Sequence, residues 1–476
     1  MPAPELTESN VRHLLRRTEF VDRPDRVAEL LGLASMADAV DNVMDVPETP
    51  QQVVFGAGSE NWERGTELTH FWFNQMAHDS PKPLQEKMAF FWHGHFCTEF
   101  GKVDLAELMR EQIDLWRTDG LGNVRDLAKT MSLQVAMIRY LDNNENSADA
   151  ANQNFARELM ELFLLGVGNY SEADVEASTS AWTGHTDRWQ DDTYWWRDEW
   201  HDGSDKPFLG QTINQDKSDR PGHGPETIDV MLSTGIVPND AIEVANRGRL
   251  TRDVAAEFLS FKLWTEFATD TQPPPDVRDA MRDALVANDF DVRPWLSVML
   301  NHEGFYTDEV KAGLVRPPVE YVVAMLYAIG VQSEEPNVLW KMNMMGQRPF
   351  FPPNVSGWKP NGYWINASSM EGRAYTAQSF RWVSGRTYWQ TDGVLSFAGG
   401  DISRAEITAN TYDPGTQTHI PDLSNVDLLD QMLDLMRISL PAATRDEILE
   451  FADASSVWER VDMLLLILLS PEMNMA

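Results

Sequence analysis

Apolar residues recur three and four positions apart along most of the chain, which is the spacing that puts side chains on one face of an α-helix. The segment 84–95 follows the helix-breaking sequence Pro81-Lys82-Pro83 and carries a face of Leu84, Met88, Phe91, Trp92 and His95. The same periodicity predicts helices over 11–15, 26–44, 151–166, 225–232, 251–268, 277–286, 292–301, 317–329 and 427–469. Ser171 followed by Asp174 indicates a capped helix start.

Two stretches interrupt this pattern. From Gly184 to Gly224, glycine, proline, aspartate and tryptophan dominate, so we expect a long ordered loop that has room for a short hairpin. Loops of this length inside a compact domain are uncommon and usually functional. Pro349 to Gly362 is a second irregular stretch. The pattern therefore predicts a mainly α protein: one large helical globular domain over 1–476, helical over 1–183 and 225–476, with long Trp-rich and Pro/Gly-rich loops.

Composition and charge narrow the classes of partner. The 476 residues are 42% hydrophobic, which is enough for a large packed core, and the formal net charge is −35. An acidic surface repels nucleic-acid phosphates and anionic lipid headgroups, so we expect neither nucleic acid nor a membrane as a partner. The apolar run 463–469 is much shorter than the roughly 20 residues of a membrane helix. The start of the chain lacks an export signal, so we expect a cytoplasmic protein unless a leader has been removed.

His93 and His95 form the first candidate for chemistry. An H-x-H pair chelates a metal readily from a strand, whereas on a helix two such residues lie about 200° apart around the axis and diverge. Because 84–95 reads as a helix, we expect only one of them to point inward, and we choose His95. The alternative is a core histidine that is satisfied by a hydrogen bond.

A polar stripe on the segment from Ala151 to Gly166 is the second candidate. Asn154, Arg157, Glu158 and Glu161 are spaced by three, one and three residues, so they share one side of a regular helix. Buried carboxylates need partners, and Arg157 is the local one. The stripe is either an Arg–Glu network that holds helices together or part of a site in which Glu158 and Glu161 act as catalytic carboxylates, with Asn154 and Arg157 contacting substrate.

The loop residues His201 and Asp202 complete this hypothesis. A His-Asp pair on a loop is well placed to finish a site that helices prepare. Together with His95, Glu158 and Glu161, this pair gives a set of ligands compatible with Zn, Fe or Mn. His93 is a further candidate ligand. In a hydrolytic version, the metal lowers the pKa of a bound water and a free carboxylate takes its proton. The helical pair is Glu-x-x-Glu, however, and H-E-x-x-H is absent.

Tryptophans are the other unusual feature of the irregular region. Trp182, Trp195, Trp196 and Trp200 lie close together in sequence, with Trp189 and Tyr194 between them. Flat rings on a loop stack on sugars or other apolar ligand faces. Alternatively, the rings anchor a long loop to the body of the protein. Tyr363 and Trp364 are candidates for the same cleft.

Five stretches together resemble the bacterial family known as domain of unknown function (DUF) 1800: HLLRRTEF at 13–20, KMAFFWHGHFCTEFGKV at 87–103, NFARELMELFLLGVGNYSEADVEASTSAWTG at 154–184, FLGQT at 208–212 and GQRPFFPPNVSGWKPNGYWIN at 346–366. The resemblance implies a sulfatase-like family protein as a neighbour and partner, and often export, although this chain departs from the family in lacking a leader. His185 stands where the family tends to have an aromatic or aliphatic residue, so it transfers less well as a site residue.

These observations lead to two hypotheses about function. The first is a metal-dependent hydrolase or oxidase that acts on a carbohydrate-like or other polar substrate, with the aromatic loop as its binding wall. The second is a non-catalytic binding or assembly protein that works with a sulfatase-like partner, and a purely structural role for the polar stripe is a third reading. Phosphate-binding loops and a G-x-S-x-G nucleophile elbow are absent, and Cys97, the one cysteine, is more typical of a core residue than of a nucleophile.

Overall fold

The computed structural model describes residues 3–47, 49–213, 218–334, 336, 338–390, 412–413, 418–419, 424–455 and 462–475. The mainly α prediction is confirmed, because the described chain is dominated by helices and its strands form only two-stranded sheets. The first three helices are α1 (Glu8–Glu19), α2 (Pro24–Leu31) and α3 (Met36–Met44). The hydroxyl of Thr7 caps the start of α1, and the predicted helical stretch 26–44 divides at Gly32, where α2 ends.

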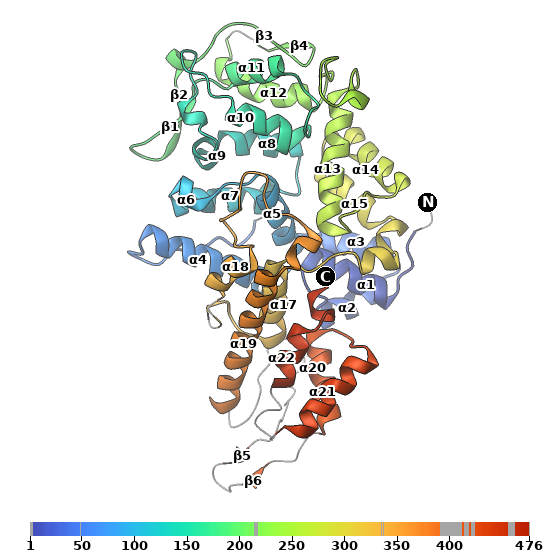
Figure 1. Ribbon diagram of the computed structural model, residues 1–476. Helices are drawn as coiled ribbons and strands as arrows, with labels where there is room; N and C mark the ends of the chain where they lie inside the picture. Colours follow the sequence, from blue (N-terminus) through green and yellow to red (C-terminus); the bar gives the residue numbers. More distant parts are fainter. Residues whose placement is uncertain are drawn as a thin grey trace.

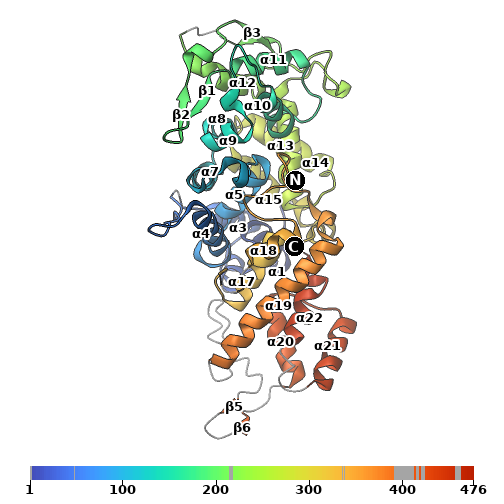
Figure 2. The same cartoon turned by 60° about the vertical axis from the view of Figure 1, so that its left-hand side comes forward.

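Helix α5 occupies the middle of the molecule, as both views show (Figures 1 and 2). Every residue of α5 except Gly94 is buried, so the helix has no solvent-facing side. Its buried charges are matched by ion pairs, which Glu86 makes with Arg117 and Lys87 makes with Glu266 and Glu320. The elements around it are α4 (Asn61–Asn74), η1 (Gln75–Asp79), α5 (Leu84–His95), α6 (Phe100–Val103), α7 (Ala106–Asp119), α8 (Val124–Leu133), α9 (Val135–Tyr140) and η2 (Asn143–Glu145).

The described residues of the predicted irregular region, 184–213 and 218–224, form two hairpins and short helical turns at one end of the molecule (Figure 1). Strand β1 pairs antiparallel with β2, with His185 opposite Trp196. The capping box of Ser171 and Asp174 is confirmed at the start of α11. The elements here are α10 (Asn154–Glu158), η3 (Leu159–Leu164), α11 (Glu172–Ala181), β1 (His185–Arg188), β2 (Thr193–Trp196), η4 (Asp198–Trp200), β3 (Lys206–Phe208), β4 (Gln211–Ile213), η5 (Arg220–Gly222), α12 (His223–Met231) and η6 (Val244–Asn246).

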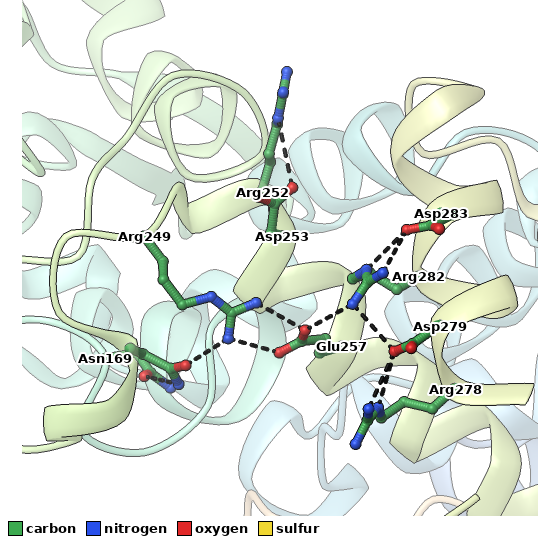
Figure 3. A network of polar contacts seen from close by, with 10 residues as sticks. Asn169, Arg249, Arg252, Asp253, Glu257, Arg278, Asp279, Arg282 and Asp283 are labelled. Carbon is green, nitrogen blue, oxygen red and sulfur yellow. Dashed lines mark hydrogen bonds and ion pairs between the residues drawn. The ribbon is translucent and has the colours of Figure 1, made fainter. Parts of the chain in front are cut away.

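Three consecutive helices pack side by side next to α5 (Figure 1). A chain of ion pairs fixes the first to the second: Glu257 binds Arg249 at 2.7 Å and Arg282 at 3.5 Å, and Arg282 also reaches Asp279 at 3.2 Å (Figure 3). The elements of this group are α13 (Thr251–Phe267), α14 (Pro275–Ala287), α15 (Val292–Leu300), η7 (Glu303–Tyr306) and α16 (Asp308–Lys311). The network holds α13 in a fixed orientation, which matters because α13 contributes to the cavity described below.

The last part of the chain returns to α5 and then extends to the other end of the molecule (Figures 1 and 2). Its elements are α17 (Pro318–Ile329), α18 (Leu339–Met345), η8 (Asn361–Trp364), α19 (Ala367–Gln390), β5 (Tyr412–Asp413), β6 (Thr418–His419), α20 (Asn425–Met436), α21 (Ala442–Ala454), α22 (Asp462–Leu469) and η10 (Glu472–Asn474). The predicted helical stretch 427–469 is therefore divided among α20, α21 and α22, and 456–461 lies outside the described residues. One contiguous hydrophobic core extends from Val11 to Met473. No described helix combines the length and hydropathy that spanning a bilayer requires.

Candidate functional site

A cavity of about 270 Å³ lies against α5 at the centre of the fold. Its walls are largely apolar, with rings from α5, α13 and the loop 346–364: Phe90, Phe91, Phe261, Trp358 and Trp364. Polar side chains interrupt these walls, namely His95, Lys262, Glu266, Glu320, Gln347 and Asn361. Asp270, Ser356 and Lys359 also line the cavity and are exposed on the protein surface, so they mark its opening. A cavity of about 150 Å³ is enough for benzene, so this one accommodates a small organic molecule.

The loop 346–364 closes one side of the cavity because it is attached to the C-terminal end of α5. The backbone amide of Phe350 donates a hydrogen bond to Nε2 of His93 at 2.9 Å, and the carbonyl of Phe350 accepts one from the amide of Phe100 at 2.9 Å. Gly357, with φ +74°, lies so near Gly94 that an added Cβ would be 2.3 Å from the Gly94 carbonyl oxygen. The irregular stretch seen in the sequence is therefore a fixed cavity wall.

His93 and His95 diverge, as the helix geometry predicts, but the expectation that only one points inward is wrong. His93 is completely buried among aromatic rings that include Trp72, Trp116 and Trp358. His95 lines the cavity, stacks on Phe91, and donates from Nε2 to the carbonyl oxygen of Phe163 at 2.8 Å. Both rings are enclosed because α5 is surrounded by protein on all sides. Burial lowers the pKa of each imidazole to about 3, so both are neutral.

Lys262 contributes an amine to the cavity without a matching acid. Within the described part of the chain, no carboxylate comes within ion-pair distance of Lys262, and its ammonium lies 5.5 Å from the centre of the Phe258 ring. Burial lowers the pKa of Lys262, and its charge interacts with Cys97 and His95. Cys97 is itself buried, its thiol donates to the carbonyls of His93 and Gly94, and burial raises its pKa to about 12. This thiol is a core group, as the sequence indicates.

The opposite charge lies one helical turn away, on Glu266. Lys87 binds Glu266 at 2.9 Å and also binds Glu320, so two carboxylates share one buried ammonium. Burial raises the pKa of Glu266, Lys87 lowers it, and the negative charge of Glu320 raises it, with a net upward shift. The Glu266 side chain keeps 27% of its surface, which faces the cavity. Lys262 and Glu266 were not recognised from the sequence, because each looks like an ordinary polar residue on an amphipathic helix.

The helix that carries the predicted polar stripe changes type within it. Residues 154–158 form the α-helical turn α10, and 159–164 continue as a π-helix, in which residues rotate differently around the axis. Arg157 forms an ion pair with Glu172 of α11 at 2.7 Å. This is an Arg–Glu pair that holds α10 to α11 from the surface, and the charges of Arg157 and Glu161 both act on Glu158.

The other members of the stripe have separate local partners. Glu161 accepts a hydrogen bond from the hydroxyl of Tyr170 at 2.5 Å. Asn154 donates to the carbonyl oxygen of Leu141 at 3.2 Å. Glu158 is half-buried, and burial followed by repulsion from Glu161 raises its pKa. Glu158 and Glu161 are absent from the cavity lining, which the same segment reaches through Leu162.

His201 belongs to a buried histidine cluster beneath the β1–β2 hairpin, with His185 and His223. Nδ1 of His201 donates to the carbonyl oxygen of Thr183 at 2.8 Å, so Nε2 accepts from Nδ1 of His223 at 2.8 Å. Burial lowers the pKa of His201 to about 4 and that of His185 to about 3. Asp202 accepts from the amide of Ser204, and its carbonyl oxygen accepts from Lys206. The sequence contains no spacing that would have pointed to His223.

The structure consequently does not bring the predicted ligand set to one point, namely His95, Glu158, Glu161, His201 and Asp202. His95 lines the central cavity, while both ring nitrogens of His201 are engaged within the histidine cluster. Across the residues that the structure describes, there is no group of three or more His, Cys, Asp or Glu side chains arranged to hold a metal ion. A single metal centre would need segments that lie in different parts of the fold, those that carry His95, Glu158, Glu161 and His201.

The tryptophans of 182–200 lie outside the cavity lining and divide into two groups. Trp182 is completely buried and donates to Thr227 at 3.1 Å, and Trp196 packs against His185 and His201, so these two anchor the hairpin. Trp195 and Trp200 instead pack on the guanidinium of Arg197, at 4.9 and 3.7 Å, and Trp189 is 80% exposed. The tryptophans that line the cavity are Trp358 and Trp364, of which Trp364 was a candidate from sequence.

Three of the family-like sequence segments meet at the cavity: 87–103 through Phe91 and His95, 154–184 through Leu162, and 346–366 through Trp358. Fold and site together define a mainly α protein with a small cavity of mixed polarity enclosed at its centre. A family model described as "Protein of unknown function (DUF1800)" matches residues 13–475, and the chain belongs to this family. Searches of curated proteins and of solved structures found no match.

Proposed function

We propose that the protein is an enzyme that binds a small molecule in the central cavity and transforms it by proton transfer, with Lys262 and Glu266 as the acid–base pair. One observation supports this most strongly. The two side chains lie one turn apart on α13, line the same cavity, and have pKa values that burial moves toward each other. A lowered pKa makes a lysine a better proton donor, and a raised pKa makes a glutamate a better proton acceptor.

The two groups would have complementary roles. Glu266 in its ionised form is a base that takes a proton from water or from the substrate, and its raised pKa strengthens it as a base. Lys262 in its ammonium form donates a proton to a leaving group, and its lowered pKa strengthens it as an acid. Hydrolysis, the reaction expected from the sequence, needs this combination of base and acid. His95, held in one orientation by its bond to Phe163 and by stacking on Phe91, would position the substrate beside Lys262.

The experiment is consumption of small molecules from a cell extract. Purified protein is incubated with the low-molecular-weight fraction of the extract, and mass spectrometry follows which compounds decrease and which appear. We expect Glu266→Gln to slow this conversion by about 100-fold or more, the usual contribution of a general acid or base. Glu176→Gln, at an exposed position of α11, is the matched control. An extract left unchanged by the wild-type protein would contradict the proposal.

The divalent metal expected from the sequence, Zn, Fe or Mn, stays a prediction. Elemental analysis of the purified protein tests it directly, and His95→Ala and Glu158→Ala show whether a bound metal depends on these residues. Stoichiometric metal that survives both substitutions would place its site elsewhere than predicted.

The alternative function, a non-catalytic assembly protein with a sulfatase-like partner, is favoured by one feature of the surface. The β1–β2 hairpin exposes Trp189, and Trp195 and Tyr194 are each 37% exposed. Exposed aromatic rings are enriched where proteins bind each other. Co-purification of wild-type protein and a Trp189→Ala variant from the native host tests this reading, which predicts that a sulfatase-like protein is retained by the wild type only.

A further inference from the structure

The charges inside the cavity are separated, and this separation restricts which small molecules fit. The wall formed by α13 carries the amine of Lys262 on one turn and the carboxylate of Glu266 on the next, so their Cβ atoms are about 6 Å apart. The two side chains do not form an ion pair with each other; Glu266 is bound to Lys87. Each group is thus free to meet a different charge on a ligand.

The side of the cavity that Lys262 lines favours an anionic group on the ligand. Lys262 forms no ion pair with any described residue, which is unfavourable for a partly buried ammonium, and a carboxylate on the ligand would supply the missing counter-charge. His95, the other polar group on this side of the cavity, is neutral and adds no charge of its own next to the ligand. The aromatic rings around it leave a dry environment in which a charge-assisted hydrogen bond is strong.

The side of the cavity that Glu266 lines favours a cationic hydrogen-bond donor on the ligand. Glu266, Glu320 and the exposed Asp270 all line the cavity. Lys87 lies behind this wall, and so does the buried Arg17, whose guanidinium donates to the carbonyl oxygen of Val310. Oε1 of Glu266 binds Lys87, while the side chain keeps 27% of its surface exposed and lines the cavity. An ammonium group fits here because it offers several donors to the acidic lining.

We propose that the ligand of the central cavity is a small zwitterion of the amino-acid or short-peptide type, with its carboxylate on Lys262, its ammonium on Glu266, and an apolar side chain between Phe91, Trp358 and Trp364. This inference rests on the proposed function and names its substrate class. The apolar rings provide affinity, and the two charged ends of the cavity provide orientation.

Four probes separate the contributions of the two charges. L-phenylalanine carries both, L-phenylalaninamide lacks the carboxylate, N-acetyl-L-phenylalanine lacks the ammonium, and N-acetyl-L-phenylalaninamide lacks both. Calorimetric titration of the full chain should give the tightest binding for L-phenylalanine or for the dipeptide Phe-Phe. Removing either charge from the probe should weaken binding by at least about tenfold.

Variants of the protein then assign each charge to its partner. Lys262→Met should abolish the preference for a free carboxylate and keep the preference for a free ammonium, and Glu266→Gln should do the reverse. Lys129→Met, which removes a surface lysine paired with Asp229, is the control and should change neither preference. The probe series on the wild-type protein is decisive even if a variant fails to fold.

Two outcomes would overturn the inference. If the neutral or singly charged probes bind as tightly as the zwitterion, the cavity does not recognise both charges. If no probe binds, amino acids and short peptides are excluded as ligands of the central cavity. Neither outcome contradicts the proposed enzyme, which is judged separately by conversion of compounds in the extract.

Discussion

Gly357 lies directly against the carbonyl oxygen of Gly94, and this contact joins the loop 346–364 to the last turn of α5. A Cβ on Gly357 would be 2.3 Å from that oxygen and 3.1 Å from the thiol sulfur of Cys97. Its φ of +74° is also a backbone conformation that other residues adopt at a cost. The glycine at 357 thus lets a distant loop approach a buried helix closely enough to complete the cavity wall.

Gly357→Ala should destabilise the protein more than loss of a positive φ alone explains. A positive φ costs a non-glycine residue about 1–2 kcal/mol, and the contact with a backbone oxygen adds to this because neither chain can move away easily. Gly58→Ala is the control, since Gly58 has a φ of +81° and its added Cβ would meet nothing within 4 Å. We expect urea unfolding to show a loss of about 3 kcal/mol or more for Gly357→Ala and of about 1 kcal/mol for Gly58→Ala. Equal losses would mean that the loop is free to shift.

The buried pair of Arg117 and Glu86 should show strong coupling in a double-mutant cycle. Both side chains are about 1% exposed and 2.8 Å apart, and Glu86 also accepts from the indole of Trp72. Arg117→Met leaves a buried carboxylate without its cation, so we expect a loss of about 3–5 kcal/mol in the free energy of unfolding. Combining it with Glu86→Gln should recover a substantial part of this loss, because the stranded charge is removed. Additive losses in denaturant titrations would argue against the pairing.

Acid should unfold the protein partly through its buried histidines. The folded-state pKa of His93 is about 3, below the ordinary 6.5 that applies when the chain is unfolded. Between pH 6.5 and 3, the unfolded chain therefore binds a proton on His93 that the folded protein does not bind. The contribution of the neutral His93 to the free energy of unfolding is fully present above pH 6.5 and is lost progressively toward pH 3.

His93→Gln isolates this effect, because the glutamine oxygen still offers an acceptor to the amide of Phe350. Between pH 6 and 4, the free energy of unfolding of the wild type should fall more steeply than that of the variant by about 1.4 kcal/mol per pH unit. Equilibrium unfolding at several pH values measures both slopes. Identical slopes would mean that His93 takes up its proton in the folded protein.

Substitutions of the tryptophans should distinguish anchoring rings from surface rings. Trp182 is completely buried, so Trp182→Ala should cost about 3–5 kcal/mol through lost packing and the cavity that remains. Trp189 is 80% exposed, so Trp189→Ala should stay within about 0.5 kcal/mol of wild type. Thermal or urea unfolding makes the comparison. A large loss for Trp189→Ala would show that its ring packs more firmly than its exposure indicates.

Much of the fold was predictable from local patterns. The helical periodicity of 251–268 and 317–329, the capping box of Ser171 and Asp174, and the irregular stretches 184–224 and 349–362 all depend on neighbouring residues, and the structure bears them out. The π-helix at 159–164 was not predictable, because its sequence has the same three- and four-residue spacing as an α-helix. The ion pair of Arg157 with Glu172 and the hydrogen bond of Glu161 with Tyr170 were not predictable either, because both partners lie on a segment beyond this helix.

By itself, the sequence determined a mainly α chain with an acidic surface, and it marked the segments 87–103, 154–184 and 346–366 as distinctive. Only the tertiary structure decided that these three segments surround one cavity and that His95 and His201 lie in different environments. It also decided which polar residues acquire unusual chemistry. The physical reason is that burial and charge partners shift a pKa, and both are set by contacts between residues far apart in the chain, such as Lys87 with Glu266.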